Sequence, residues 1–217
     1  MLVSISSVTA AETIAIIGTG EVAAALGPEF AAQGHDIIYG SRDPFSEKVQ
    51  NVVANTPGAS AKLPADSVRD AGIVVLAVPG MLVEEITRSL GDLSGKIIID
   101  PTNALVGDWE TELTMGVETS NGRVIQDTAP GAHVVKAFST LNWRQMVEPG
   151  GDISILLAGD NEEAKAKVAA MVEAMDLHPI DLGGVDNSQH IEAMTLLWLN
   201  NRIAGRQHFE FYLRPVN

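Results

Sequence analysis

The sequence contains no cysteine among its 217 residues, which excludes disulfide bonds, thiolate metal sites and cysteine nucleophiles. Positive charge is also scarce: 14 lysines and arginines stand against 28 aspartates and glutamates, and the net charge is −14. That balance argues against nucleic acid or an anionic membrane as a partner. No apolar run is long enough to span a bilayer, and residues 1–11 lack the features of a secretory signal. We therefore expect a cytoplasmic protein with neither kind of partner.

A strand–turn–helix–strand unit stands near the start of the chain. Residues 13–17 are apolar and β-branched, as in a buried parallel strand. Residues 18–23 read G-x-G-x-x-A, the dinucleotide fingerprint with alanine in the third position. An alanine-rich helical run then ends at Gly34, and residues 36–40 form a second strand. The flanking elements favour a nucleotide site over the alternative, a glycine turn in any α/β protein.

Each small residue of the fingerprint has a physical role. Gly18 lets the chain turn sharply out of the strand, and Gly20 lets a pyrophosphate approach the backbone. The amides of Thr19, Glu21 and Val22 are predicted to face the phosphates from the positive end of the helix. We therefore predict cofactor contacts from Gly18 through Val22.

The end of the second strand indicates which nucleotide is bound. An NAD site usually has an acidic residue there, for the ribose 2′-hydroxyl. This chain has Ser41 and Arg42, which suit a 2′-phosphate. Asp43 is the alternative acid, but it precedes Pro44 as an N-cap precedes a proline at the first helical position. We predict NADP(H) rather than NAD(H).

Further apolar runs predict strands at 72–79, 96–100, 133–138, 153–158 and 178–182, with a last helix over 186–203. Ligands lie at the carboxyl ends of strands in open parallel sheets, so Ala77, Val78 and Pro79 should border the nicotinamide. Residues 105–122 are polar and irregular. We expect them to form a loop with some part in closing the site. The alternative is a surface loop that has no part in the site.

Polar groups at strand ends are candidates for chemistry, but each has a structural alternative. Asp100 is expected to hold the following turn. Lys136 either pairs with an acidic neighbour or binds a phosphate or carboxylate of a second substrate. His190, near the start of the last helix, is the best histidine candidate, and a structural role is favoured even there. We predict no catalytic acid, base or nucleophile and no metal site.

Several motifs together resemble the NADPH-dependent reductases of the deazaflavin coenzyme F420 and the related cytosolic domain of six-transmembrane metalloreductases. The matching pieces are IGTG at 17–20, GSR at 40–42, VLAVP at 75–79, IDPTN at 99–103 and VVKAF at 134–138. The resemblance extends from residue 13 to about residue 203. The pieces at 40–42 and 134–138 are the more specific ones.

This resemblance implies an α/β fold of Rossmann type, with a doubly wound, mostly parallel sheet and a small C-terminal helical extension. Residues 12–182 would form the NADP-binding domain, and residues 183–217 a helix and tail that close the cleft or form a dimer contact. The resemblance adds Asn103 and Ala137 to the cofactor contacts. The family usually has asparagine where this chain has Ser139, a position expected to face the cleft where the second substrate stacks.

The function implied is hydride transfer between NADPH and coenzyme F420, or a flavin, as the small-molecule acceptor. Direct transfer between two stacked rings needs no acid–base group. This agrees with a sequence in which we predict no catalytic acid, base or nucleophile. A non-catalytic NADP(H) sensor and an NADP-dependent reductase of another small substrate are the alternatives. The apolar helix and tail after residue 186 predict a homodimer, with packing over the cleft as the alternative.

Overall fold

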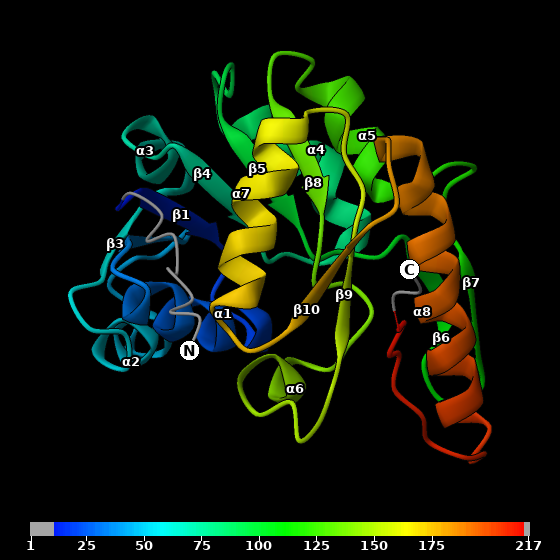
Figure 1. Cartoon of the computed structure of the whole chain (residues 1–217). Helices are drawn as coiled ribbons and strands as arrows, with labels where there is room; N and C mark the ends of the chain where they lie inside the picture. The colour runs from blue at the N-terminus through cyan, green and yellow to red at the C-terminus, as the bar shows by residue number, and fades with distance from the viewer. Residues whose placement is uncertain (1–10, 215–217) are drawn as a thin grey trace, which may run out of the picture.

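The structure is a computed structural model that describes residues 11–214. A six-stranded sheet with strand order β3-β2-β1-β4-β5-β8 forms its centre, and every pairing in it is parallel (Figure 1). Its strands are β1 (Thr13–Ile17), β2 (Asp36–Gly40), β3 (Ser60–Lys62), β4 (Ile73–Leu76), β5 (Ile97–Asp100) and β8 (His133–Lys136). The strand order reverses between β1 and β4, which is the switch point where this fold binds ligands.

The sheet is buried on both faces because its central strands are apolar at nearly every position. In β1, Ile14 and Ile16 belong to one core cluster and Ala15 and Ile17 to the other, as the two-residue period of a strand requires. The helices are α1 (Glu21–Ala32), α2 (Glu47–Ala54), α3 (Pro64–Arg69), α4 (Val83–Ser89), α5 (Asn121–Thr128), α6 (Trp143–Val147), α7 (Glu162–Glu173) and α8 (Ser188–Ile203). Short 3₁₀ turns, η1 (Gly80–Leu82) and η2 (Val185–Asn187), precede α4 and α8.

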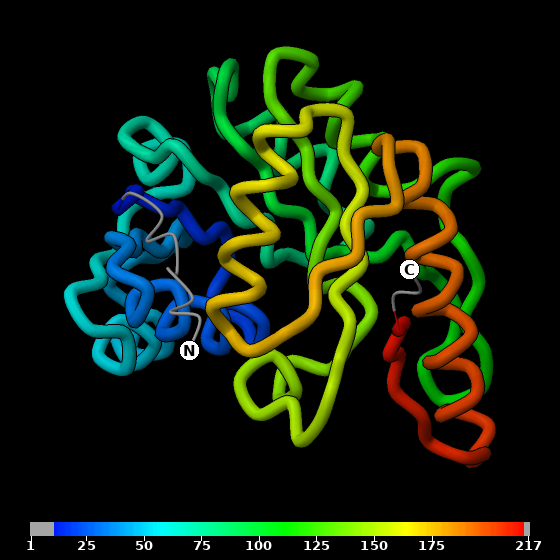
Figure 2. Tube along the Cα trace, in the orientation of Figure 1, coloured from blue at the N-terminus to red at the C-terminus, as the bar shows by residue number. Residues whose placement is uncertain are grey.

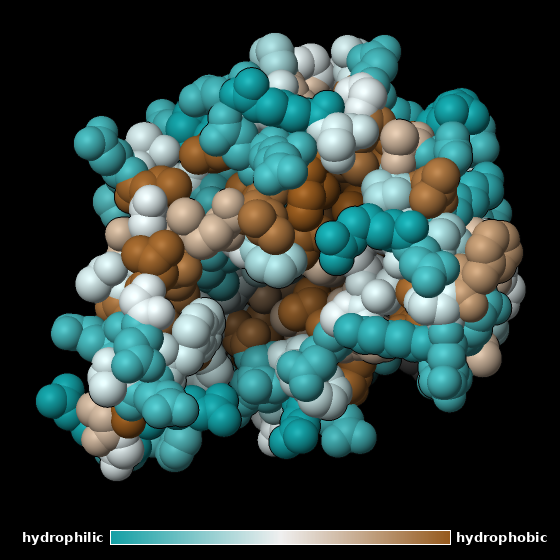
Figure 3. Space-filling view, turned by 180° about the vertical axis from the view of Figure 1, so that it is seen from behind, coloured by the Kyte–Doolittle hydropathy of each residue, from teal (hydrophilic) through white to brown (hydrophobic). Residues whose placement is uncertain are grey.

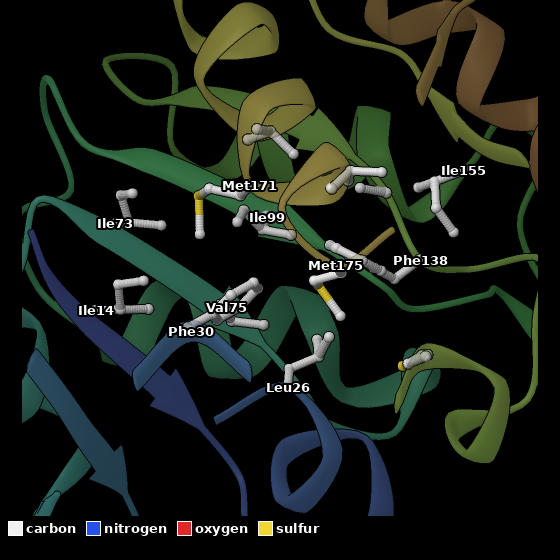
Figure 4. Close-up of a cluster of buried hydrophobic side chains, with 14 of the residues drawn as sticks. Ile14, Leu26, Phe30, Ile73, Val75, Ile99, Phe138, Ile155, Met171 and Met175 are labelled. Atoms are coloured by element: carbon white, nitrogen blue, oxygen red, sulfur yellow. The ribbon is translucent and has the colours of Figure 1, made fainter. Parts of the chain in front are cut away.

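The larger core cluster joins the sheet to α1 and α7. Figure 4 shows Leu26 and Phe30 of α1 and Met171 of α7 pointing toward Val75 and Ile99 of the sheet. The second cluster covers the other face with side chains from α3, α4 and α5. The predicted fold class, a doubly wound Rossmann-type sheet with a C-terminal helical extension, is confirmed.

The last two strands form a parallel pair of their own, β9 (Ser154–Leu157) with β10 (His178–Asp181). An antiparallel bridge between Lys136 and Ala158 joins this pair to the edge of the main sheet. After α8 the chain doubles back beside that helix (Figure 2), where the Trp198 indole donates to the Phe209 carbonyl and the Ser154 amide donates to the Phe211 carbonyl. The tail therefore packs within its own chain.

Two local predictions are wrong. Part of the expected loop 105–122 is an antiparallel hairpin of β6 (Leu105–Asp108) and β7 (Glu112–Met115). It is stable because Leu113 is buried and its amide and carbonyl are both bonded to the Asn200 side chain of α8, each at 2.9 Å. Asp43 caps no helix: α2 begins at Glu47, and the Asp43 carboxylate accepts from the Phe45 amide in a turn.

The last long helix begins two residues later than expected, because the 3₁₀ turn η2 takes up the preceding residues. Between residues 11 and 214, none of the helices has the length and apolar character needed to cross a membrane.

Candidate functional site

The glycine-rich turn after β1 packs directly against the ends of its two neighbouring strands. Gly18 has φ +108°, and a Cβ placed there would lie 2.2 Å from the Ala77 carbonyl oxygen beyond β4, so a side chain is excluded. Its amide donates to the Gly40 carbonyl of β2 at 3.0 Å. A Cβ at Gly20, in contrast, would meet no atom within 4 Å. The space above Gly20 is therefore open to a ligand.

Helix α1 begins at this open space. Its N-cap residue is Gly20, which has no side chain to accept from the first amides of the helix, so these amides keep their capacity to bind an anion. Thr19 and Val22 are half-buried and Glu21 is exposed, whereas Ala23 is fully buried against the sheet. The fingerprint thus has the close helix packing and the free amides that a pyrophosphate site requires.

Ser41 and Arg42 lie at the carboxyl end of β2, beside this turn. The Ser41 amide donates to the Lys62 carbonyl at 3.0 Å, and its hydroxyl accepts from the Asp43 amide at 3.3 Å. The Arg42 side chain is exposed and takes part in none of the ion pairs found in residues 11–214. Its guanidinium is available for an anionic ligand.

The ends of β4, β5 and β8 border the other half of the site. Ala77 and Val78 are half-buried and Pro79 is exposed. Asn103 is half-buried, and its side-chain amide donates to the Ser139 carbonyl at 3.0 Å, which brings the loops after β5 and β8 together.

Two of the predicted site residues lie deeper than expected. Ala137 is fully buried and Ser139 is only 3% exposed, with its hydroxyl enclosed. The expected exposure of Ser139 to the cleft is therefore not seen. Asn103 and Thr195 of α8 both donate to the Ser139 carbonyl, so segments distant in sequence pack against this turn.

The backbone conformation of Phe138 was not predicted from the sequence. This residue adopts a left-handed conformation, which costs a bulky residue free energy. Packing maintains it: the ring is buried and meets Phe30 of α1 edge-on, with centroids 6.2 Å apart. The next carbonyl, that of Ser139, accepts from Asn103 and from the Thr195 hydroxyl of α8 at 2.9 Å. No sequence signal marks this turn, since its conformation depends on contacts from distant segments.

A buried ionic cluster lies beneath the loops that follow β5 and β8. The Lys136 ammonium is 2.5 Å from Asp100 Oδ2, 2.7 Å from Glu192 Oε1 and 2.7 Å from the Thr102 carbonyl, and all three charged side chains are 0% exposed. The ammonium thus donates to the Thr102 carbonyl and forms ion pairs with both carboxylates. Of the two alternatives for Lys136, pairing with acidic neighbours is confirmed. We call Asp100, Lys136 and Glu192 the ionic cluster.

Both carboxylates of the ionic cluster accept hydrogen bonds from backbone amides. Asp100 Oδ1 accepts from the Thr102 amide at 2.8 Å and its hydroxyl at 2.6 Å, which confirms that Asp100 holds the turn after β5. Glu192 Oε2 accepts from the Ala104 amide and Oε1 from the Asn121 amide, each at 2.9 Å. Burial alone would lower the pKa of Lys136, but the charges of Asp100 and Glu192 overcome it and raise that pKa above its usual value.

Apolar surface is found outside the core as well. Figure 3, which views the molecule from behind, shows brown apolar surface gathered around a hollow near the middle of this face. On η1, just after β4, Met81 and Leu82 are 50% and 46% exposed. Such surface suits the flat faces of an aromatic ligand.

These features define a class of protein: an NADP-dependent oxidoreductase of the Rossmann type. Residues 13–104 match the family model described as NADP oxidoreductase, coenzyme F420-dependent. The solved structure of a candidate F420-dependent NADP reductase from Arthrobacter sp. FB24 is 30% identical, covers 94% of this chain and 100% of its own, and superposes with a TM-score of 0.85. The chain belongs to the F420-dependent NADP oxidoreductase family.

Three further relatives share less sequence identity with the chain. The F420-dependent NADP reductase of Methanothermobacter thermautotrophicus is 27% identical over 209 residues, which cover 89% of this chain and 90% of the relative. The rat metalloreductase STEAP3 is 27% identical over 188 residues, but the match spans only 37% of its length. A reductive aminase from Aspergillus terreus, solved with NADPH, shares the fold at 18% identity with a TM-score of 0.67.

Proposed function

We propose that this protein transfers hydride between NADPH and a deazaflavin of the coenzyme F420 type, with a flavin as the second choice of acceptor. The single observation that carries the proposal is the turn after β1, where Gly18 is pressed against β4 while the space above Gly20 is open and faces uncapped amides. A family model and full-length relatives named as F420-dependent NADP reductases support the choice of acceptor.

The choice of NADP(H) over NAD(H) rests on Ser41 and Arg42. Arg42 is exposed and unpaired among the described ion pairs, at the strand end that meets the adenosine ribose in this fold. A guanidinium can grip a phosphate with two parallel hydrogen bonds. An acidic residue, which an NAD site needs at this position, is absent from residues 40–42.

Along the sheet edge, the cofactor would extend from Arg42 past Gly20 to the loops at Ala77 and Asn103. The cofactor supplies the chemistry, a hydride that moves from the dihydronicotinamide to the acceptor ring. The protein's part is to hold both rings face to face and to exclude water. Ala77 and Val78 border that position with small side chains, and Asn103 joins the loop after β5 to the loop after β8.

A calorimetric titration tests the nucleotide part of this proposal. The parent protein should bind NADPH much more tightly than NADH, and Arg42→Ala should remove most of that difference. Arg88→Ala is the matched control, because Arg88 is an exposed arginine paired with Glu84 on α4, away from the glycine turn. Equal affinity of the parent for the two nucleotides would overturn the assignment of a 2′-phosphate site.

An acceptor panel tests the reaction. NADPH is mixed with the protein and coenzyme F420, a flavin, or a ferric chelate, and oxidation of the nicotinamide is followed optically. Rapid oxidation with a ring acceptor supports the proposal. Tight NADPH binding without oxidation by any acceptor would indicate a nucleotide sensor instead.

A further inference from the structure

The ionic cluster carries a net charge of −1 inside the protein, since two carboxylates surround one ammonium. Asp100 Oδ1 and both Glu192 carboxylate oxygens accept from backbone amides. Asp100 Oδ2 is 2.5 Å from the Lys136 ammonium and has no hydrogen-bond partner among the described residues.

The cluster lies at the nicotinamide end of the proposed site. Asp100 is the last residue of β5 and Lys136 is the last residue of β8. Asn103, at the nicotinamide end of the proposed cofactor path, and Ala137, a predicted cofactor contact, follow these two residues within three positions. Ser41 and Arg42, which mark the adenosine end, follow β2, and β1 and β4 separate β2 from β5.

We propose, on the basis of the function proposed above, that the ionic cluster tunes the site to the oxidised cofactor. The nicotinamide ring of NADP⁺ carries a positive charge and that of NADPH is neutral. A buried net negative charge near the ring attracts the oxidised ring and leaves the reduced ring unaffected, and low solvent exposure keeps that attraction from being screened. The parent protein then binds NADP⁺ more tightly than NADPH.

The positive end of α5 offsets part of this charge, because the Asn121 amide donates to Glu192. Removing one negative charge should still change the ratio of the two dissociation constants by about tenfold, which corresponds to about 1.4 kcal/mol. Glu192→Gln removes that charge from α8, and Asp100→Asn removes it from β5. Both amides are close in size to the acids they replace.

The experiment measures the dissociation constants of NADP⁺, NADPH and 2′,5′-ADP by calorimetry for the parent and the two variants. Each variant should lose affinity for NADP⁺ relative to NADPH, while 2′,5′-ADP, which has no nicotinamide, binds as before. Glu163→Gln is the matched control. It makes the same charge change at an exposed residue near the start of α7 and should leave the ratio unchanged.

The measured dissociation constants decide whether the ionic cluster favours binding of the oxidised cofactor. An unchanged ratio in both variants would overturn the inference, as would a parent protein that favours NADPH. The parent measurement decides the matter by itself if neither variant folds. A parent that binds neither nucleotide would overturn the proposed function, which is a separate failure. A shift in thermal stability with no change in the ratio would show that the ionic cluster is purely structural.

Discussion

Replacing Lys136 with methionine should destabilise the protein severely. The change removes an ammonium that has contacts of 2.5 and 2.7 Å with two carboxylates and 2.7 Å with a carbonyl, all in a fully buried position. Two like-charged carboxylates would then remain without their counterion. Breaking a buried pair in this way costs about 3–5 kcal/mol, which for a chain of this size lowers the melting temperature by about 6–20 °C.

The same variant should acquire a particular pH dependence. Without Lys136, the two buried carboxylates would repel each other with no counterion between them. Protonation at low pH would relieve that repulsion, so acid should favour the folded variant. The deficit relative to the parent should therefore be smaller at pH 5 than at pH 8.

The parent protein should lose the stability that Lys136 contributes only at high pH. The raised pKa of Lys136 means that its ammonium stabilises the fold fully at neutral pH. That contribution is lost only as the pH rises through the folded-state pKa, above the ordinary lysine value of about 10.4.

Urea denaturation of both proteins at several pH values measures these effects. Lys167→Met is the matched control, because Lys167 forms a partly exposed ion pair with Glu12 and its loss should cost less than about 1 kcal/mol. A loss of the same size for Lys136→Met would refute the view that the ionic cluster supports the fold, and a deficit independent of pH would refute the protonation argument.

Three further predictions concern the nucleotide site and assembly. Arg42→Ala should weaken NADPH binding by about 1.5–3 kcal/mol and leave NADH binding unchanged, and equal losses in calorimetry would contradict the 2′-phosphate contact. Gly20→Val should abolish binding of both nucleotides in a protein with parental thermal stability, because a Cβ at this position meets no atom within 4 Å; normal affinity would show that the glycine is not at the pyrophosphate. We expect a homodimer through α8, where Leu197 is 63% exposed; light scattering should show a dimer for the parent and a monomer for Leu197→Asp, and a monomeric parent would contradict it.

Much of the fold could be predicted because the signals were local. The apolar β-branched runs at β1, β4 and β5 and the glycine fingerprint each lie within a few residues, and each has one favoured structure. The hairpin of β6 and β7 was missed because each strand has only four residues, and because its contacts with Asn200 come from far along the chain.

Only part of the site could be predicted, because some of its contacts come from segments that are distant in the sequence. Gly18, Gly20 and Arg42 follow strands in sequence, so the fold places them at the sheet edge. The ionic cluster could not be predicted in full, because Glu192 reaches Lys136 from a helix of the C-terminal extension. Ser139 was expected at the cleft surface, but it is buried in a turn that Asn103 and Thr195, which are distant in sequence, contact.

Anaerobic mixing of the protein with NADPH and coenzyme F420 tests the proposed hydride transfer most directly. The absorbance of the oxidised deazaflavin and that of NADPH should fall together, one molecule of each for every turnover, and the reaction should be slow with NADH. Because no protein group transfers a proton in a direct hydride step, the rate should vary weakly with pH around neutrality. If NADPH binds tightly and neither coenzyme F420 nor a flavin is reduced, the proposed reaction is wrong.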